Sequence, residues 1–585
     1  MAAFLSVCCA LASVLAIAAQ DAPTPPAPEL LDHAALSARM GAIAGAHPEC
    51  AALVPVGFSR ARRRIDALRF SAGEPAVAQP AILVVANIDG PQAFSSAVAL
   101  THAQALADGF ANDKLVQDFL AKTTVYIVPR ANPDAAEARF AMPRFELEAT
   151  GTGVDNDRDR RDGEDPPSDV DGDGVVAWMR WKDPEGQWIL DPKDPRAMLK
   201  ADPKKGQRGE YMLALEGRDL DRDETPSEDG TNDAILNQNF PQDWQEHGAA
   251  AGRFPMDEPE ARALAEFMLQ HKEIAMVVTY GALDTLVEKP KSVADGAAAQ
   301  KRIPAAGWLE SDAALLAELS KRYGELTTNK TKGRGSDSGS FQAWVYQHRG
   351  LWSLAIPLFD IPTEAKKKEP ASGDKTAEDN PAGGDAAKQD DAPKARGKSE
   401  KKDEAKPSED LARLEWIDAS NEAARFVPWK SFAHPELGAV EIGGFAPFAR
   451  TEPPTADWPK IAKRELDFLL TLGADLPRVS IEEFSAKRLS PGLIEVKAAI
   501  YNGALLPLAS KSGQRTESSR PLKCVLVLPE GASIASGSKQ TLIRDLGGKS
   551  RREMHWLVVC DQPTQIGLKL DSDNAGAATA MVEVK

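Results

Sequence analysis

The sequence predicts an α/β domain with a mixed, mostly parallel sheet flanked by helices, followed by a C-terminal all-β sandwich domain. Continuous apolar runs at 81–85 and 125–128 are typical of strands buried on both faces, and helical patterns alternate with them. After Pro477 the pattern changes to short alternating strands separated by Gly, Pro, Ser and Asp, which favours a sandwich.

Length and charge limit the functional classes. The chain has 585 residues, too many for one ordinary domain. Its formal net charge of −17 disfavours non-specific binding to nucleic acid, so we expect no nucleic-acid partner. No segment of the mature chain is long and apolar enough to span a membrane.

The N-terminus predicts export. Residues 1–19 are apolar and end near the small residues Ala16-Ile17-Ala18, as a signal peptide does before its cleavage site. A linker rich in Pro and Ala follows at 20–29. We therefore expect a secreted or periplasmic protein, and the alternative interpretation of 1–19 is a buried helix.

The α/β domain is expected to span 30–475. Its elements are predicted in this order: a helix within 30–50, a hairpin over 52–70, a strand at 81–85, a helix at 92–106, a strand at 125–128, a helix at 257–271, a strand at 274–279, a helix at 310–323, a strand within 344–359 and a helix at 457–472.

Two insertions interrupt this domain. Residues 140–235 lose the periodic pattern and carry acidic clusters, over a length that is too great for a plain loop. Residues 363–410 consist almost entirely of Lys, Glu, Asp, Ala, Pro, Gly and Ser. Because few of these side chains can form a core, we expect 363–410 to be disordered.

The sandwich domain is expected to span 476–585. Its strands are predicted at 494–501, 523–528, 541–544, 554–559, 565–570 and 581–584. Cys524 and Cys560 both belong to this domain. A disulfide between them and two buried free thiols are both compatible with the sequence.

A polar turn follows the strand at 81–85. A strand that ends in such a turn and leads into a helix is where α/β proteins place their chemistry. Asp89 and Gln92 lie three residues apart at this turn, so we considered them as a metal site.

Several segments of 30–475 resemble the zinc carboxypeptidase family of the carboxypeptidase A type. The matching segments are Gly57-Phe58-Ser59 with Arg63-Arg64-Ile65, then Pro129-Arg130-Ala131-Asn132-Pro133-Asp134, then Leu236-Asn237-Gln238-Asn239-Phe240-Pro241, and finally Gly339-Ser340 with Trp344 and Tyr346. The acidic insertion and the run at 434–444 resemble a bacterial branch that also has a C-terminal β domain.

The resemblance implies a defined chemistry. In the family, a His-x-x-Glu pair and a later His hold zinc, a glutamate activates the metal-bound water, and arginines hold the substrate carboxylate. Such a catalytic zinc needs three protein ligands and one open position.

The family's catalytic residues are absent when this pattern is carried over. The zinc positions fall on Asp89, Gln92 and Gly281, and the catalytic glutamate falls on Pro357. Of these, only the Asp89 side chain offers a charged ligand atom, and a proline cannot accept a proton. Gln238 replaces a substrate-binding arginine.

The neighbour of that glutamine, Asn237, is retained. Asn237 and Gln238 are therefore the candidate substrate-binding residues. Zinc is expected for the family, whereas this ligand set makes it doubtful here.

The acidic insertion contains candidate calcium ligands. Alternating aspartates followed by a glycine form the first half of a calcium loop. The two candidate clusters are Asp169, Asp171 and Asp173, and Asp219, Asp221 and Asp223. Arg180 occupies the position where an EF-hand carries its bidentate glutamate, so the first cluster is not an EF-hand. A solvated acidic loop without calcium is the alternative.

The leading functional hypothesis is an exported, non-catalytic member of this family that binds peptides or C-terminal carboxylates. The alternative is an active metallocarboxypeptidase with a reorganised zinc site. A structural envelope protein is a third hypothesis, resting on the export signal and the β domain.

Overall fold

The computed structural model describes most of the chain. The described residues are 26–72, 79–150, 165–220, 226–227, 234–248, 250–296, 302–363, 408–561 and 565–584. The predicted signal peptide therefore lies outside the described residues. The chain forms two compact units, of which the first comprises Met1–Trp181, Leu213–Asp360 and Arg425–Lys585 and the second comprises Lys182–Met212 and Ile361–Ala424.

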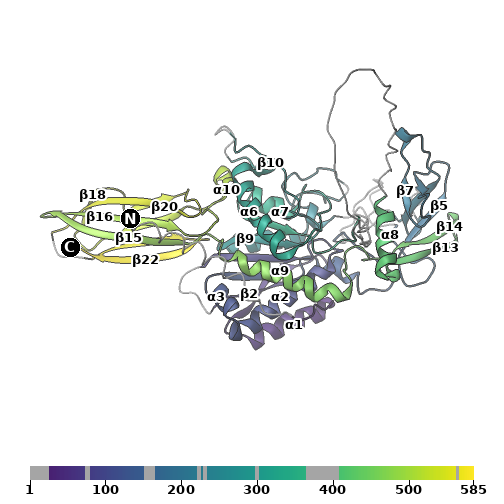
Figure 1. The fold of residues 1–585 in the computed structure, drawn as a ribbon, viewed down its shortest axis with the longest axis horizontal. Helices are drawn as coiled ribbons and strands as arrows, with labels where there is room; N and C mark the ends of the chain where they lie inside the picture. The colour runs from purple at the N-terminus through teal and green to yellow at the C-terminus, as the bar shows by residue number, and fades with distance from the viewer. Residues whose placement is uncertain are drawn as a thin grey trace, which may run out of the picture. The chain divides into compact units, whose positions relative to one another are not determined.

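A six-stranded mixed sheet forms the centre of the first unit (Figure 1). Its strand order is β1 (Ala51–Phe58), β2 (Arg64–Phe70), β4 (Thr124–Val128), β3 (Ala81–Ala86), β9 (Ile274–Tyr280) and β12 (Trp352–Ile356). The four strands from β4 to β12 run parallel, and β1 and β2 form an antiparallel edge. The predicted α/β class is confirmed.

Helices cover both faces of this sheet. Alternate residues of β3 point to opposite faces, so Ile82 and Val84 join one core and Leu83 and Val85 join the other. The first core is closed by α1 (His33–Ala46), α2 (Ala93–Asn112), α3 (Lys114–Leu120), α6 (Glu310–Thr327) and α9 (Trp458–Leu472). The second core is closed by α5 (Pro259–Gln270) and α7 (Phe341–Gln347).

The first unit also contains shorter elements. They are the helix α4 (Pro133–Glu137), the 3-10 helices at Leu236–Gln238 and Thr455–Asp457, and the two-stranded parallel sheet of β10 (Ser292–Val293) and β11 (Trp308–Leu309). A further 3-10 helix, Ala423–Arg425, begins in the second unit and ends in the first. Among the helices that the structure describes, none has both the length and the apolar character needed to cross a membrane.

The acidic insertion contains strands that the sequence pattern did not predict. The strand β5 (Trp178–Lys182), whose last residue belongs to the second unit, pairs through Trp178–Arg180 with β14 (Gly438–Phe445) of the first unit, and β14 pairs with β13 (Phe426–His434). The pairing partners lie about 260 residues apart, as in the pair Arg180 and Glu441. Local periodicity cannot indicate a strand whose partner is so distant. The next strand, β8 (Tyr211–Leu215), crosses the boundary between the two units.

The second unit is small. It contains the hairpin of β6 (Trp188–Leu190) and β7 (Met198–Lys200), a 3-10 helix at Pro203–Lys205 and the helix α8 (Glu409–Ser420). Ser408 caps α8 by accepting a hydrogen bond from the backbone N–H of Leu411. This helix begins inside the segment predicted to be disordered, of which 364–407 lie outside the described residues.

Two four-stranded antiparallel sheets form the C-terminal part of the first unit. One sheet contains β15 (Val479–Ser490), β16 (Leu493–Asn502), β20 (Ser550–Val559) and β18 (Ser533–Ser536). The other contains β19 (Gln540–Ile543), β17 (Leu522–Val527), β21 (Gln565–Ser572) and β22 (Gly576–Glu583). Both sheets contribute to one core around Trp556, as a sandwich requires.

The structure also adds three elements to the predicted sandwich, namely β15, β18 and the helix α10 (Lys511–Thr516). Cys524 and Cys560 are buried free thiols in this structure, which answers the question that the sequence left open.

Candidate functional site

The candidate site lies at the carboxyl ends of three parallel strands. Asp89 lies in the turn after β3, Gly281 follows β9 directly, and Pro357 follows β12 directly. The backbone N–H of Gly281 donates to the carbonyl oxygen of Ile356 across 3.3 Å. The register Val85–Thr279 and Ile356–Tyr280 brings these strand ends to one edge of the sheet.

The Asp89 carboxylate is held by two donors. Its Oδ1 accepts a hydrogen bond from the side-chain amide of Asn237 at 2.9 Å, and its Oδ2 accepts one from the backbone N–H of Ala282 at 2.7 Å. Burial raises the pKa of Asp89, and these two hydrogen bonds lower it. The carboxylate is thus oriented by the protein.

Asp89 and Gly281 occupy adjoining space. A Cβ atom added to Gly281 would overlap Oδ2 of Asp89. A side chain at residue 281 therefore requires the Asp89 carboxylate to move away from its two donors. The Asp89 carboxylate in this position and a side chain at residue 281 therefore exclude one another.

Gln92 and Pro357, the two remaining residues at the family's zinc and catalytic positions, are both buried. Gln92 is buried at the start of α2, where its side chain makes no capping hydrogen bond, and its backbone N–H donates to the carbonyl of Asp89 at 3.0 Å. Pro357 is buried, and its carbonyl oxygen accepts a hydrogen bond from the amide of Asn329 at 3.0 Å. Asn329 also donates to the hydroxyl of Tyr323 at 2.8 Å.

The two candidate substrate-binding residues differ in their surroundings. Besides its bond to Asp89, Asn237 accepts a hydrogen bond from the backbone N–H of Phe341 at 3.0 Å. Asn237 therefore ties the Asp89 turn to the start of α7. Gln238 is half-buried, and its backbone packs against Gly339, where a Cβ would overlap the Gln238 carbonyl.

The site also contains charged residues that the sequence analysis missed. Arg334 donates its backbone N–H to the carbonyl of Ala282 at 2.7 Å, and its side chain forms an ion pair with Asp360 at 3.2 Å. Glu146 accepts a hydrogen bond from the backbone N–H of Phe448 at 2.6 Å. These residues come from separate loops, so no local spacing marks them.

The carboxyl groups of this site influence one another. Glu148 is exposed overall. The pKa of its carboxyl group is nevertheless raised, mainly by partial desolvation and secondly by the negative charge of Asp89. Burial and the Glu148 charge likewise raise the pKa of Glu146. Arg334 and Arg450 act in the opposite direction on both glutamates.

A separate acidic group lies in the insertion. In the described part of the chain, three carboxylates bring ligand atoms within 4.8 Å of one another: Asp169, Asp171 and Glu216. Glu216 was not predicted, because it follows β8 and lies 45 residues from Asp171. Asp173 is exposed and accepts a hydrogen bond from the backbone N–H of Val175 at 2.9 Å.

The second predicted calcium cluster is described only in part. Asp219 is half-buried, whereas Asp221 and Asp223 lie outside the described residues. Arg180, which takes the place of the EF-hand glutamate, forms an ion pair with Glu441 at 2.8 Å and lies over the ring of Trp429.

Comparison with known families agrees with this fold. Residues 36–364 match the model of the zinc carboxypeptidase family, and residues 478–583 match a domain of unknown function. Because the first match covers more than half of the chain, the chain belongs to the zinc carboxypeptidase family.

Individual relatives are distant. Carboxypeptidase E of Caenorhabditis elegans is 30% identical over 136 residues, which are 22% of this chain and 29% of that protein. This chain thus matches less than a third of that relative's length.

Among solved structures, the carboxypeptidase A from Helicoverpa armigera is 14% identical, with a TM-score of 0.35 over 58% of this chain and 66% of that one. Bovine thrombin-activatable fibrinolysis inhibitor, in complex with tick carboxypeptidase inhibitor, is 14% identical, with a TM-score of 0.33 over 58% of this chain and 88% of that one.

Proposed function

We propose that this chain is an exported, non-catalytic member of the zinc carboxypeptidase family that binds peptides through the carboxyl end of its central sheet. The main support is the contact between Asp89 and Gly281. The aspartate uses both oxygens in hydrogen bonds to protein donors, and its Oδ2 fills the space next to Gly281.

The residues at these positions do not fit a catalytic zinc ion. Such an ion needs three protein ligands, usually nitrogen, sulfur or charged oxygen atoms. Asp89 supplies one carboxylate, Gln92 a neutral amide and Gly281 no side chain. Pro357 stands where a general base is needed and has no group that accepts a proton at neutral pH.

An elemental analysis combined with an activity assay tests this proposal. We expect the purified full-length protein to contain far less than one zinc per chain and to release no C-terminal residue from peptide substrates. Stoichiometric zinc, with turnover that a chelator abolishes, would establish the alternative, an active metallocarboxypeptidase with a reorganised site. A known zinc carboxypeptidase purified in parallel is the positive control for both measurements.

The proposed ligand is a peptide with a free C-terminal carboxylate. Gln238 is half-buried at the site and takes the place of a family arginine, so its amide is the candidate donor to that carboxylate. We expect a fluorescent peptide library to bind less well after C-terminal amidation or after Gln238→Ala. Equal binding of free and amidated peptides by both proteins would contradict this assignment.

Export is proposed from the N-terminal sequence. N-terminal sequencing of the protein recovered from its native host should find a chain that begins after about residue 19. A mature protein that still carries Met1 in the cytoplasm would rule export out.

We also propose calcium binding by Asp169, Asp171 and Glu216. The ligand atoms of these residues converge, and Ca²⁺ prefers such oxygen ligands. Glu216 is buried and accepts hydrogen bonds from the backbone N–H groups of Val170 and Ala177, at 2.6 and 3.0 Å. Glu216 would supply the negative charge that a glutamate supplies in an EF-hand, where this chain has Arg180 instead.

Isothermal titration with calcium tests this second proposal. We expect heat of binding with the native chain and none with Asp169→Asn or Glu216→Gln. Glu185→Gln, on an exposed turn, is the matched control and should bind like the native chain. No calcium heat with the native chain would leave the solvated acidic loop as the correct interpretation.

A further inference from the structure

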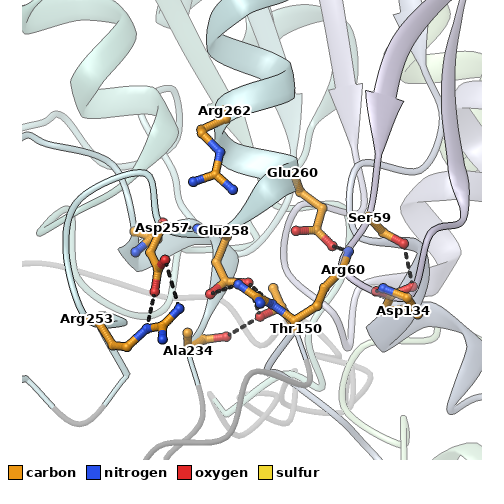
Figure 2. A network of polar contacts seen from close by, with 12 residues as sticks. Ser59, Arg60, Asp134, Thr150, Ala234, Arg253, Asp257, Glu258, Glu260 and Arg262 are labelled. Atoms are coloured by element: carbon orange, nitrogen blue, oxygen red, sulfur yellow. Dashed lines mark hydrogen bonds and ion pairs between the residues drawn. The ribbon is translucent and has the colours of Figure 1, made fainter.

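A buried threonine, Thr150, joins two points of the chain that lie 84 residues apart in sequence. The backbone N–H of Thr150 donates to the carbonyl oxygen of Ala234 at 2.9 Å. The Thr150 hydroxyl lies 3.0 Å from the same carbonyl and 2.7 Å from Oε2 of Glu258 (Figure 2). A hydroxyl has one proton, so it donates to one of these acceptors at a time. We call Thr150, Ala234 and Glu258 the clasp.

Arg60 links the clasp to a second buried glutamate. Its guanidinium reaches Glu258 through Nε at 3.3 Å and through a terminal nitrogen at 3.4 Å. Its backbone N–H donates to Oε1 of Glu260 at 2.9 Å. Figure 2 shows the Arg60 side chain running from beside Glu260 to Glu258. The side-chain contacts are long for charge-assisted hydrogen bonds, so a competing anion can displace them.

Glu260 is such an anion when it ionises. It is fully buried, and its Oε2 has no hydrogen-bond partner in the described structure. The carboxylates whose charges act on it are Glu258, the N-cap of its own helix, and Asp134 in α4, and the neighbouring arginines are Arg60 and Arg63 from the turn after β1. The two arginines already pair with Glu258 and Asp134, respectively.

These surroundings oppose the charged form of Glu260. Burial, together with the negative charges of Glu258 and Asp134, raises the pKa of Glu260 to about 7, although the N–H of Arg60 acts against this shift. The carboxyl group therefore changes its charge close to neutral pH.

The clasp is also connected to the candidate site. Thr150 follows Glu148 by two residues, and the carboxyl group of Glu148 lies near enough to Asp89 to respond to its charge. The chain just before Thr150 lies against the Asp89 turn, because a Cβ on Gly90 would overlap the carbonyl oxygen of Leu147. A movement of Thr150 can therefore reach the Asp89 turn through the three residues that precede it, Leu147 to Ala149.

We propose that the clasp is a proton-sensitive device, in which ionisation of Glu260 draws Arg60 from Glu258 and loosens the Thr150–Ala234 connection. Its role in regulation rests on the proposed function, because the segment that it fixes lies against the Asp89 turn, where the peptide is proposed to bind. With Glu260 neutral, Arg60 stays on Glu258 and the clasp is closed. With Glu260 ionised, Glu258 loses Arg60 and takes the Thr150 hydroxyl from the Ala234 carbonyl, so the chain at Leu147 is held less firmly against the Asp89 turn.

Amide hydrogen exchange of the full-length protein tests the device. After correction for the intrinsic pH dependence of exchange, we expect the protection of the Thr150 N–H to fall by about tenfold between pH 6 and pH 8. In Glu260→Gln, which cannot ionise, protection should stay high at both pH values. Constant protection in the native chain, or an equal fall in Glu260→Gln, would overturn the proposal.

Two further variants complete the test. Glu266→Gln changes an exposed glutamate on the same helix and should behave like the native chain. Thr150→Val removes the hydroxyl and should give low protection at both pH values. The amides of β9 should stay protected in every variant, as evidence that the chain is folded. The measurement uses neither zinc nor peptide, so its failure and the failure of the proposed function are distinguishable.

Discussion

At the scale of single residues, the candidate site depends on the absence of one side chain. Gly281 is next to Asp89, and the space for its Cβ is taken by a carboxylate oxygen that accepts the N–H of Ala282. Replacing Gly281 therefore forces either the carboxylate or the strand end to move. Overpacking of this kind costs about 1–3 kcal/mol in other proteins.

Gly281→Ala should lower the free energy of unfolding by about 1–3 kcal/mol, because its methyl group displaces the Asp89 carboxylate. Gly324→Ala is the matched control, since Gly324 is exposed within α6 and a Cβ there meets no atom within 4 Å. The control should gain about 0.5–1 kcal/mol from helix propensity. Urea unfolding measures both values, and equal effects of the two substitutions would contradict the contact.

Glu260 should make stability depend on pH. Its pKa is raised from an ordinary value of 4.5 to about 7, so the folded state favours the neutral form. The resulting stabilisation is complete below pH 4.5 and is lost as the pH rises through 7. One pKa unit corresponds to about 1.4 kcal/mol, so the full loss is about 3 kcal/mol.

Glu260→Gln should remove this loss. The variant should match the native chain at pH 4.5 and exceed its free energy of unfolding by up to about 3 kcal/mol at pH 8. Urea unfolding at the two pH values gives the difference, with Glu266→Gln as the reference for a change of surface charge. A constant difference across this range would show that Glu260 does not titrate there.

At the scale of elements, sequence periodicity predicted the parts of the fold that are stabilised locally. The apolar run at 81–85 became the fully buried strand β3, and the pattern at 457–472 became α9. It missed β5, whose partner β14 lies about 260 residues further on. Sequence periodicity likewise did not predict the roles of Glu216 and Arg334. Each lies in a loop that brings it close to partners far away in the sequence.

The residues of the candidate site divide in the same way. Asp89 and Pro357 are predictable, because each follows a buried strand in a parallel sheet. The hydrogen bonds from Asn237 and Ala282 to Asp89 are not, since they depend on side-chain geometry that no pattern encodes.

The contact between the chain just after α7 and the helix α10 depends on two glycines, Gly350 and Gly513. Gly350 has a positive φ of 65°, and a Cβ on it would overlap the Cα of Gly513. The Ser510 hydroxyl donates to the Gly350 carbonyl at 2.7 Å. The sandwich is thus held against the α/β domain by backbone groups that approach closely.

Gly350→Ala should separate these elements and lower the free energy of unfolding by about 3 kcal/mol or more. Gly531→Ala is the control, because Gly531 also has a positive φ of 80° but a Cβ there meets no atom within 4 Å. The control carries only the backbone strain, about 1–2 kcal/mol. If urea unfolding gives the same loss for both, the close approach of Gly350 to Gly513 does not contribute.

At the scale of the whole molecule, one buried carboxylate connects the α/β domain to the sandwich. Asp312 in α6 accepts hydrogen bonds from the backbone N–H groups of Lys511 and Ser512, at 2.8 and 3.1 Å, and from the hydroxyl of Tyr346 at 2.8 Å. Burial raises the pKa of Asp312, and these donors lower it. A hydrogen-bonded carboxylate in such a place favours joint unfolding of the two parts.

The chain contains its own probes for this cooperativity. Cys50 is buried in the α/β domain and Cys524 in the sandwich, and burial raises the pKa of each thiol to about 11. Both thiols should resist alkylation in the native protein, because they are covered and protonated. Each becomes reactive when its own domain unfolds, and mass spectrometry distinguishes the two labelled peptides.

In the native chain, Cys50 and Cys524 should become reactive at the same urea concentration, because Asp312 couples the two domains. In Asp312→Ala the backbone N–H groups of Lys511 and Ser512 lose their acceptor, at a cost of about 1–3 kcal/mol. Cys524 should then react at a lower urea concentration than Cys50. Glu310→Ala, at the exposed start of the same helix, should leave the two transitions together. Separate labelling transitions in the native chain would show that the sandwich unfolds independently of the α/β domain.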